Sequence, residues 1–481
     1  MQNLWSHTGR GIAVSALALA LTACQSMRGP EPVAQASIPS SYTAAASGTS
    51  MAEQGYKDFF ADQRLLQVLD MALNNNRDLR TATLNIQRAQ QAYQITENNQ
   101  LPTIGASGSV LRQDTLSTTK PVTSYNVGLG VTAYELDFWG RVRSLKDNAL
   151  DSYLATQSSR DATQIALIGQ VAQAWLNYSF ANANLKLADQ TLKTQLESYN
   201  LNKKRFDVGI DSELPVRQAQ ISVETARNDV ANYKTQVAQA QNLLNLLVGE
   251  QVPSALLPTQ RVTRITNTTA FGAGLPSDLL NNRPDIRTAE YRLSAAGANI
   301  GAAKARLFPS ISLTGNAGYA STDLSDLFKS GSFVWAVGPS IDLPIFDWGT
   351  RQANIKISET DQQIALADYE KSIQSAFREV NDALAVRQNI GDRLAAQKRL
   401  VDATNTTYKL SNARFRAGID NYLTVLDAQR TSYAAEQGLL LLEQANLNNQ
   451  VELYKSLGGG VKTNTSDVTS QPASSAERKS Q

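Results

Sequence analysis

The side chains best suited to catalysis or metal binding are nearly missing from this sequence. It holds one histidine, His7, and one cysteine, Cys24, and both lie close to the N-terminus. A Ser-His-Asp triad, a cysteine nucleophile and a zinc site all need such residues inside the folded body. Chemistry that uses only carboxylates stays open in principle. The sequence therefore predicts a protein that is not an enzyme and that needs no cofactor or metal.

The first residues have the composition of a secretory signal. Arg10 stands before an apolar run from Gly11 to Leu21, which is the order found in signal peptides. The run ends in Leu21-Thr22-Ala23-Cys24, which resembles a bacterial lipobox, where the cysteine thiol receives a diacylglycerol. The alternative is an ordinary cleaved signal with an incidental cysteine. We expect a signal peptide over 1–23 and lipidation of Cys24, with Gln25 permitting transfer to the outer membrane.

Composition also limits the partners. The chain has 481 residues, a formal net charge of +2 and 18% charged residues. It shows no basic cluster with interleaved aromatic residues, which nucleic-acid binding requires. We therefore expect no nucleic-acid partner.

The sequence contains an internal duplication, in which four motifs recur in the same order at an offset of about 207 to 209 residues. We predict two repeats, 61–250 and 275–458, a linker over 251–274, an extended N-terminal segment over 24–60 and a mobile tail over 459–481. The matching motifs are Asn75–Ala82 with Asn281–Ala289, Leu101–Ile104 with Phe308–Ile311, Trp139–Arg141 with Trp348–Arg351, and Arg205–Asp211 with Arg414–Asp420.

Each repeat predicts one very long helix. Proline is absent between Pro121 and Pro215 and again between Pro344 and Pro472, and both stretches are rich in good helix formers. A single helix over 141–207 would be about 100 Å long. No globular domain of this size buries such an element, so the pattern predicts a coiled-coil-like shaft.

Glycines mark the ends of these long helices. Gly209 and Gly418 can take the left-handed conformation that ends a helix. We expect Asp211 and Asp420 to cap the helix that follows. This predicts two helical hairpin tips, one for each repeat, at the same end of the molecule.

A second pattern, with a period of two residues, predicts four strands. Apolar residues alternate with small or polar residues over 125–133, 311–319 and 333–345, and more faintly over 104–110. A half-buried sheet of a soluble sandwich gives the same alternation. Strands of about 10 residues match a tilted bilayer span, however, and no helix is patterned to cover a second sheet face. Four strands cannot close a barrel alone, so the pattern predicts an oligomer and leaves its stoichiometry open.

Taken together, these features resemble the TolC-like outer membrane factors, and in particular the lipid-anchored branch typified by OprM. The resemblance covers nearly all of the mature chain and includes the run Tyr422–Arg430. It implies an α+β membrane protein in which the duplicated helix-strand-strand-long helix-helix repeats form a trimeric 12-stranded β-barrel with a long α-helical coiled-coil tunnel. It also implies a homotrimer in outer membrane lipid, a periplasmic adaptor and an inner-membrane pump of the resistance-nodulation-division type.

The resemblance also implies a periplasmic gate at Leu423, Asp427 and Arg430. Three symmetry-related Asp427 carboxylates would form a cation-attracting constriction, Leu423 an apolar plug, and Arg430 a partner for a neighbouring carboxylate. The alternative is that Asp427 and Arg430, three residues apart on one helix, are an ordinary surface pair. The first repeat has Gln218 and Ile221 at the equivalent positions, as expected if one hairpin gates.

By the same resemblance, the hairpin tips contact the adaptor. The glycines and aspartates among these residues are also ordinary turn chemistry, and both roles are compatible. The tip residues concerned are Arg205, Gly209, Asp211, Arg414, Gly418 and Asp420.

Two smaller motifs accompany these. Arg77 and Arg283 lie near helix starts, and we expect them to be structural. The aromatic residues Trp139, Trp348, Phe138 and Phe346 stand at strand-to-helix junctions, where they anchor at the membrane interface or pack against the shaft.

Three other protein classes compete with a drug- or solute-efflux channel. A periplasmic adaptor would lack the twin strand pairs, and a structural coiled-coil lipoprotein would lack amphipathic strands. The outer-membrane duct of a type I protein secretion system has the same architecture, because a pore fold does not encode its cargo.

Overall fold

A computed structural model of the chain describes most of the mature sequence and divides into two compact units. Unit 1 holds the described residues up to 35 with 84–157 and 288–371, and unit 2 holds the described residues of 36–83, 158–287 and 372–481. Each unit therefore combines matching parts of both repeats. The predicted signal peptide and the predicted lipidation site, Cys24, lie outside the described residues. These are 27–29, 32–35, 54–114, 121–267 and 278–459.

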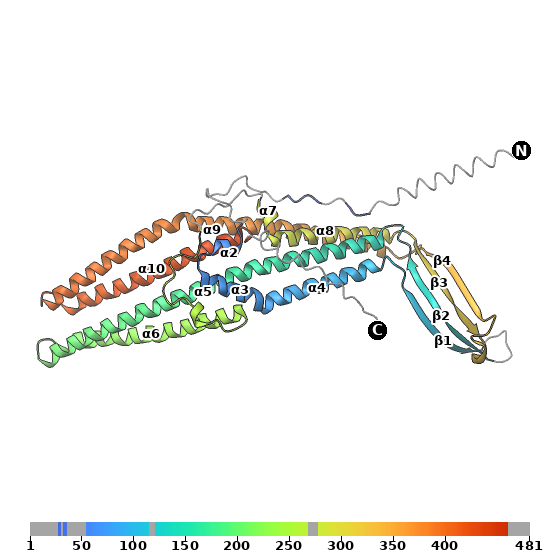
Figure 1. Ribbon diagram of the computed structural model, residues 1–481. Helices are drawn as coiled ribbons and strands as arrows, with labels where there is room; N and C mark the ends of the chain where they lie inside the picture. Colours follow the sequence, from blue (N-terminus) through green and yellow to red (C-terminus); the bar gives the residue numbers. More distant parts are fainter. Residues whose placement is uncertain (1–26, 30–31, 36–53, 115–120, 268–277, 460–481) are drawn as a thin grey trace. The chain divides into compact units, whose positions relative to one another are not determined.

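Unit 1 contains one antiparallel sheet in the order β1-β2-β3-β4 (Figure 1). The four predicted strands are confirmed, except that the last ends at Asp342 and not at Ile345. The ladder ends there because Asp342 pairs with Ser310, the first residue of β3, and β3 offers no partner beyond it. The strands are β1 (Ile104–Gln113), β2 (Val122–Glu135), β3 (Ser310–Ser321) and β4 (Phe333–Asp342).

Paired glycines allow β2 and β3 to approach closely at the middle of the sheet. Gly128 pairs with Gly318 across the two strands. A Cβ at Gly128 would lie 2.7 Å from the carbonyl oxygen of Ala317, and one at Gly318 would clash with the carbonyl oxygen of Val127. Only glycine fits both positions without moving the backbone.

Two helices of 67 residues each, α5 (Arg141–Asp207) and α9 (Thr350–Arg416), continue from unit 1 into unit 2. Each is about 100 Å long, and the predicted helix over 141–207 is confirmed. The shorter helices α4 (Arg77–Asn98) and α8 (Pro284–Ala305) precede the strand pairs. Among the described residues, no helix is both long enough and apolar enough to span a bilayer.

Unit 2 contains the C-terminal parts of α5 and α9, from residues 158 and 372 onward. It also contains the helices that follow them, α6 (Glu213–Val248) and α10 (Tyr422–Ser456). Three short helices complete it: α2 (Tyr56–Phe59), α3 (Gln63–Asn75) and α7 (Asp278–Asn282).

The N-terminal part of unit 2 belongs to its core. Phe59 and Phe60 are fully buried, and the Phe59 ring stacks on Tyr454 at a centroid distance of 4.4 Å. The core of unit 2 therefore includes residues before 61, the predicted start of the first repeat, because two aromatic rings just upstream are buried in it.

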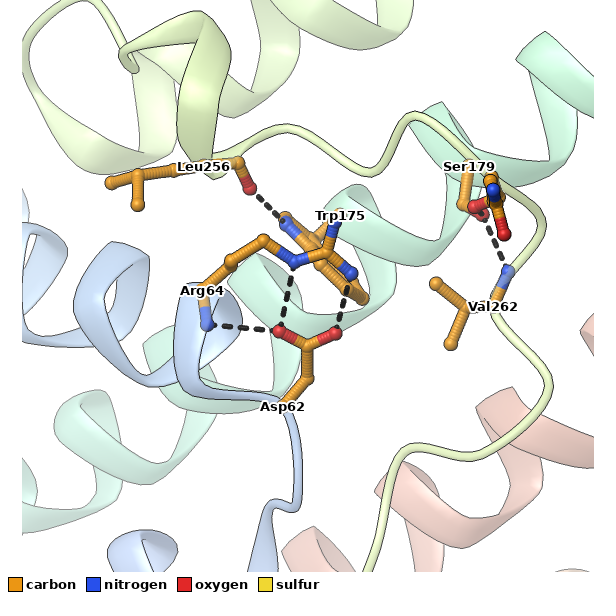
Figure 2. A network of polar contacts seen from close by, with 7 residues as sticks. Asp62, Arg64, Trp175, Ser179, Leu256 and Val262 are labelled. Carbon is orange, nitrogen blue, oxygen red and sulfur yellow. Dashed lines mark hydrogen bonds and ion pairs between the residues drawn. The ribbon is translucent and has the colours of Figure 1, made fainter.

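The segment that follows α6 is fixed to α5 by hydrogen bonds (Figure 2). The Trp175 indole N–H donates to the carbonyl oxygen of Leu256 at 3.1 Å, and the Val262 N–H donates to the Ser179 hydroxyl at 3.0 Å. Beside them, Asp62 caps α3 through the Arg64 N–H, and the Arg64 guanidinium lies over the Trp175 ring. Unit 2 is thus held together by polar contacts across its middle as well as by its core.

In unit 1, Arg28 lies on the surface of α8. Its guanidinium donates to the Ser294 hydroxyl at 2.6 Å and to the Ser294 carbonyl oxygen at 3.0 Å. Gly297 and Gly301 leave the room for this, since a Cβ on either would lie within 3.5 Å of Arg28 atoms. The chain just after Cys24 is therefore held on a glycine face of α8.

Candidate gate and docking site at the hairpin tips

Both hairpin tips end in the same backbone motif. Gly209 has φ of 76° and Gly418 has φ of 75°, as predicted. The N–H of Gly209 donates to Phe206, and the N–H of Ile210 donates to Arg205, at 2.9 and 2.8 Å. This is a Schellman motif, which satisfies the last carbonyl groups of a helix. The second tip repeats it at Gly418 and Ile419.

The prediction that Asp211 and Asp420 cap the returning helices is wrong. The N-cap residues are Ser212, whose side chain makes no cap bond, and Asn421, whose side chain accepts from the Thr424 N–H. The aspartates lie one residue too early to reach the free N–H groups of the helix. Each carboxylate turns back across the tip instead and meets the arginine six residues before it.

These ion pairs brace the two tips. Arg205 lies 2.5 Å from Asp211, and Arg414 makes two hydrogen bonds of 2.7 and 2.9 Å to Asp420. Hydrogen bonding from Arg414 holds the pKa of Asp420 below its ordinary value. The four charged residues predicted as a docking surface are therefore paired within each turn, and they fix its shape.

The two hairpins are joined near their tips by an apolar cluster. Phe415 is 5% exposed and Tyr422 is 2% exposed, and both pack with Ala219 of α6. The Arg205 guanidinium lies over the Phe415 ring at 5.2 Å, so the first tip covers a side chain of the second. Figure 1 shows the two tips at one end of unit 2, as predicted.

The three predicted gate residues lie on one exposed face of α10. Leu423, Asp427 and Arg430 are spaced by four and three residues, which places them in a row on a helix. All three are exposed, and Leu423 keeps 55% of its surface accessible. Within the described residues, neither Asp427 nor Arg430 forms an ion pair. The alternative interpretation, a surface ion pair between these two side chains, therefore has no contact to support it.

Beside this row, residues of α10, α5 and α6 line an open cavity of about 410 Å³. Leu423 and Arg430 line its α10 side, and Gln195 and Ile221 line the other side. The side-chain oxygens of Gln195 and Gln429 are buried without a hydrogen-bond partner, and so is the Tyr422 hydroxyl. Polar groups buried without a partner cost stability, so these three groups weaken the packing between the hairpins in the single chain.

Further from the tips, two tyrosines carry polar contacts between α6 and α10. The Tyr433 hydroxyl donates to Asp229 at 3.3 Å, and the Gln437 amide donates to the Tyr233 hydroxyl at 2.8 Å. Burial raises the pKa of Tyr433, and the Asp229 carboxylate raises it further. Burial also raises the pKa of Tyr422 to about 12. Both hydroxyls stay neutral at physiological pH.

The packing of Tyr422 and Tyr433 in the second hairpin was not predicted from the sequence. The signal was available, because the first repeat carries Glu213 and Glu224 at the equivalent positions. A glutamate in one repeat and a tyrosine in the other indicates a solvated face in the first hairpin and a packed face in the second.

Arg283 and Arg77 also differ in their surroundings. Arg283 is 7% exposed and pairs with Asp285 at 2.6 Å and Glu379 at 2.9 Å. Arg77, its equivalent in the first repeat, is exposed. In the described part of the chain, no group of three or more histidine, cysteine or acidic side chains is arranged to hold a metal ion.

Sequence comparison identifies the family of this architecture. The model of the family described as outer membrane efflux protein matches residues 68–250 and 275–459. The chain belongs to the outer membrane efflux protein family. The predicted resemblance to the TolC-like outer membrane factors is thereby confirmed.

Relatives extend over most of the chain. The antibiotic efflux pump outer membrane protein ArpC of Pseudomonas putida is 44% identical over 426 residues, 87% of this chain and 88% of ArpC. The solvent efflux pump outer membrane protein SrpC of Pseudomonas putida is 46% identical over 410 residues, 84% of this chain and 87% of SrpC.

A solved structure shares the fold. The open-state outer membrane channel MtrE of Neisseria gonorrhoeae superimposes with a TM-score of 0.84 and 38% identity, covering 91% of this chain and 99% of MtrE. This chain is accordingly an outer-membrane efflux channel protein.

Proposed function

We propose that three copies of this chain form a passive duct through which an efflux pump delivers drugs and other small molecules across the outer membrane. The observation that carries the proposal is the sheet of unit 1. Its strands have 10 to 14 residues, and apolar side chains such as Ile104, Leu129 and Trp335 are 59% to 71% exposed. Strands of this length and exposure suit a tilted membrane span, and a closed barrel would pair the two free edges.

No catalytic role is part of this proposal. The single histidine lies within the predicted signal peptide and the single cysteine is the predicted lipidation site, so the mature chain would offer neither an imidazole base nor a free thiol. The driving energy would come from an inner-membrane pump of the resistance-nodulation-division type.

In this proposal the exposed row on α10 forms the periplasmic gate. Three copies around one axis would bring three Asp427 carboxylates together, with Leu423 one turn nearer the tips. Arg430 has no ion-pair partner among the described residues of its own chain, so it is available to a carboxylate of a neighbouring copy.

The tips are proposed to receive the periplasmic adaptor. Each braced turn presents exposed apolar side chains beside its ion pair, since Val208, Ile210 and Ile419 are 63% to 69% exposed. A rigid turn that exposes apolar residues loses little conformational entropy when a partner covers it.

Lipidation of Cys24 is proposed to hold the N-terminal end of the chain at the membrane. Arg28, four residues later, is fixed to unit 1, the unit that contains the sheet. A short tether between the lipid and the sheet-bearing unit fits insertion of both into one membrane.

A gene deletion in the source cell tests the proposed function. We expect the deletion strain to accumulate a fluorescent small-molecule efflux dye several-fold, and the wild-type gene to restore dye exit. Normal dye exit in the deletion strain, together with loss of a secreted protein from the medium, would instead support the alternative, the outer-membrane duct of a type I protein secretion system.

A further inference from the structure

Trp348 occupies an unfavourable position at the end of the sheet in unit 1. It is 88% exposed and its backbone has φ of 55°, a region that bulky residues rarely adopt. Its ring meets Phe346 edge-on at 4.5 Å, and Phe346 is itself 71% exposed. An exposed indole on a strained backbone indicates a residue placed for a contact outside its own chain.

In the first repeat, the equivalent tryptophan, Trp139, makes its contact within the chain. Trp139 donates its indole N–H to the carbonyl oxygen of Pro309 at 2.7 Å. Its ring stacks on Phe308, with 4.7 Å between centroids and 21° between planes. Nearby, the Leu136 N–H donates to the carbonyl oxygen of Ile311 at 2.8 Å. The end of β2 is thereby locked to the start of β3.

The segment that Trp139 contacts, here called the receiving segment, is duplicated as well. Phe308-Pro309-Ser310-Ile311 before β3 corresponds to Leu101-Pro102-Thr103-Ile104 before β1. The copy of the receiving segment in the first repeat is solvent-exposed, since Leu101 is 66% exposed and Ile104 is 71% exposed. The duplicated chain thus contains two such junction tryptophans and two receiving segments, one of each per repeat, and one tryptophan is matched to a receiving segment within the chain.

The unmatched pair lies on opposite edges of the sheet. β1 and β4 are its two edge strands, so three strand spacings, about 14 Å, separate them. The Trp348 ring cannot span that width within its own chain. Both junctions are otherwise built alike, because Asp137 caps the start of α5 through Val142 and Asp347 caps the start of α9 through Arg351.

We propose that Trp348 docks on Leu101 and Pro102 of a second copy of this chain, with its indole N–H donating to the Pro102 carbonyl oxygen. The contact repeats between copies the one that Trp139 makes with Phe308 and Pro309 inside the chain. It locks the end of β4 to the start of the neighbour's β1 and so sets the register of the seam between subunits. The inference rests on the proposed oligomeric duct and names the side chain that closes it.

Cysteine crosslinking in the full-length protein tests the contact. The double variant L101C/W348C, treated in native membranes with a short bismaleimide, should give covalent dimers and trimers on denaturing gels, several-fold above either single variant. The single variants also report any crosslink through Cys24. The matched control F308C/W139C should crosslink within one chain and stay monomeric on the gel.

Light scattering of the purified variants separates the possible failures. If the protein is oligomeric and F308C/W139C crosslinks but L101C/W348C does not, the Trp348 contact is wrong and the oligomeric duct stands. That outcome would place Trp348 in the lipid interface, where brominated lipid quenches its fluorescence. Monomers of wild-type protein would overturn both the contact and the oligomeric duct.

A second set of variants tests the chemistry of the contact. W348A should lower the temperature at which oligomers dissociate in detergent, and W348F, which keeps the ring and loses the indole donor, should fall between W348A and wild type. Because Trp348 is exposed in the single chain, neither substitution should change the circular dichroism of the protein. Equal dissociation temperatures for all three proteins would contradict the proposal.

Discussion

At the scale of single residues, the two repeats place the same side chain in different surroundings. Arg283 is buried, pairs with two carboxylates and donates to the carbonyl oxygen of Ser456 at 2.9 Å. Burial by itself lowers the pKa of Arg283, but the ion pairs with Asp285 and Glu379 outweigh it and the pKa is raised. Arg77 carries the same motif on an exposed helix start.

Arg283→Ala should therefore destabilise the fold far more than Arg77→Ala. Breaking a buried ion pair costs about 3 to 5 kcal/mol, and the lower end applies here because both carboxylates keep solvent contact. An exposed substitution changes the free energy of unfolding by about 0.5 kcal/mol or less. Thermal unfolding followed by circular dichroism measures both, and equal midpoints would show that Arg283 does not hold its unit together.

A second prediction at this scale concerns pH and the second tip. Arg414 holds the pKa of Asp420 below 3.8, so the ion pair stabilises the tip fully above that value and is lost as pH falls through the lower folded pKa. The Ile419 N–H, bonded to Arg414 at 2.9 Å, reports it by hydrogen exchange. Its protection in wild type should exceed that in Asp420→Asn near neutral pH, and the two should converge in strong acid. A difference that persists in strong acid would exclude the ion pair as its cause.

At the scale of elements, the turn between α9 and α10 depends on one backbone conformation. Gly418 has φ of 75° and donates its N–H to Phe415. Gly418→Pro fixes φ at about −65° and removes the donor, so the Schellman motif cannot form. Gly418→Asn is the matched control, because asparagine tolerates positive φ.

We expect Gly418→Pro to leave the amount of oligomer in the membrane unchanged and to abolish dye efflux, while Gly418→Asn keeps most of it. The equivalent substitution Gly209→Pro should behave alike. Immunoblots of membranes and dye accumulation measure the two effects, and full efflux by Gly418→Pro would remove the tips from the docking surface.

The sheet offers a second prediction at this scale. A Cβ at Gly318 would clash with the backbone of β2, whereas one at Gly315, on the same inner strand β3, would have no atom closer than 3.6 Å. Gly318→Ala should prevent β2 and β3 from pairing and abolish the heat-resistant oligomer, since the backbone cannot yield as a side chain does. Gly315→Ala should assemble normally. Electrophoresis of unheated membranes distinguishes them, and assembly of both would contradict the close approach.

At the scale of the whole molecule, the proposed gate would be a property of the assembly. Leu423, Asp427 and Arg430 are solvent-exposed in one chain, and their proposed action requires symmetry-related copies. We expect low single-channel conductance for the wild type in planar bilayers and a several-fold rise for the double variant D427A/R430A. Replacing Gln218 and Ile221 by alanine, at the equivalent positions of the first repeat, should change conductance much less. Equal and large conductance in all proteins would remove the gate from α10.

The sequence alone determined the long helix α5, the two glycine turns and the four strands, although it placed the end of β4 three residues too far. Hydrophobic period, proline spacing and terminal glycines are local signals, so the boundaries of α5, the positive φ of Gly209 and Gly418, and the four strands were all predicted. The duplication was readable for the same reason, because each motif is a short run that repeats in order.

Only the tertiary structure decided what each copy of a motif contacts. Asp211 and Asp420 pair with arginines and do not cap helix N-termini. Phe415 is buried, while Phe206 is 42% exposed. Trp139 donates to Pro309, a contact that Trp348 does not have within the chain. Two repeats with one sequence pattern cannot occupy identical places in a single chain, since each packs against a different neighbour. The surroundings of a side chain are therefore set by long-range packing, which no local pattern contains.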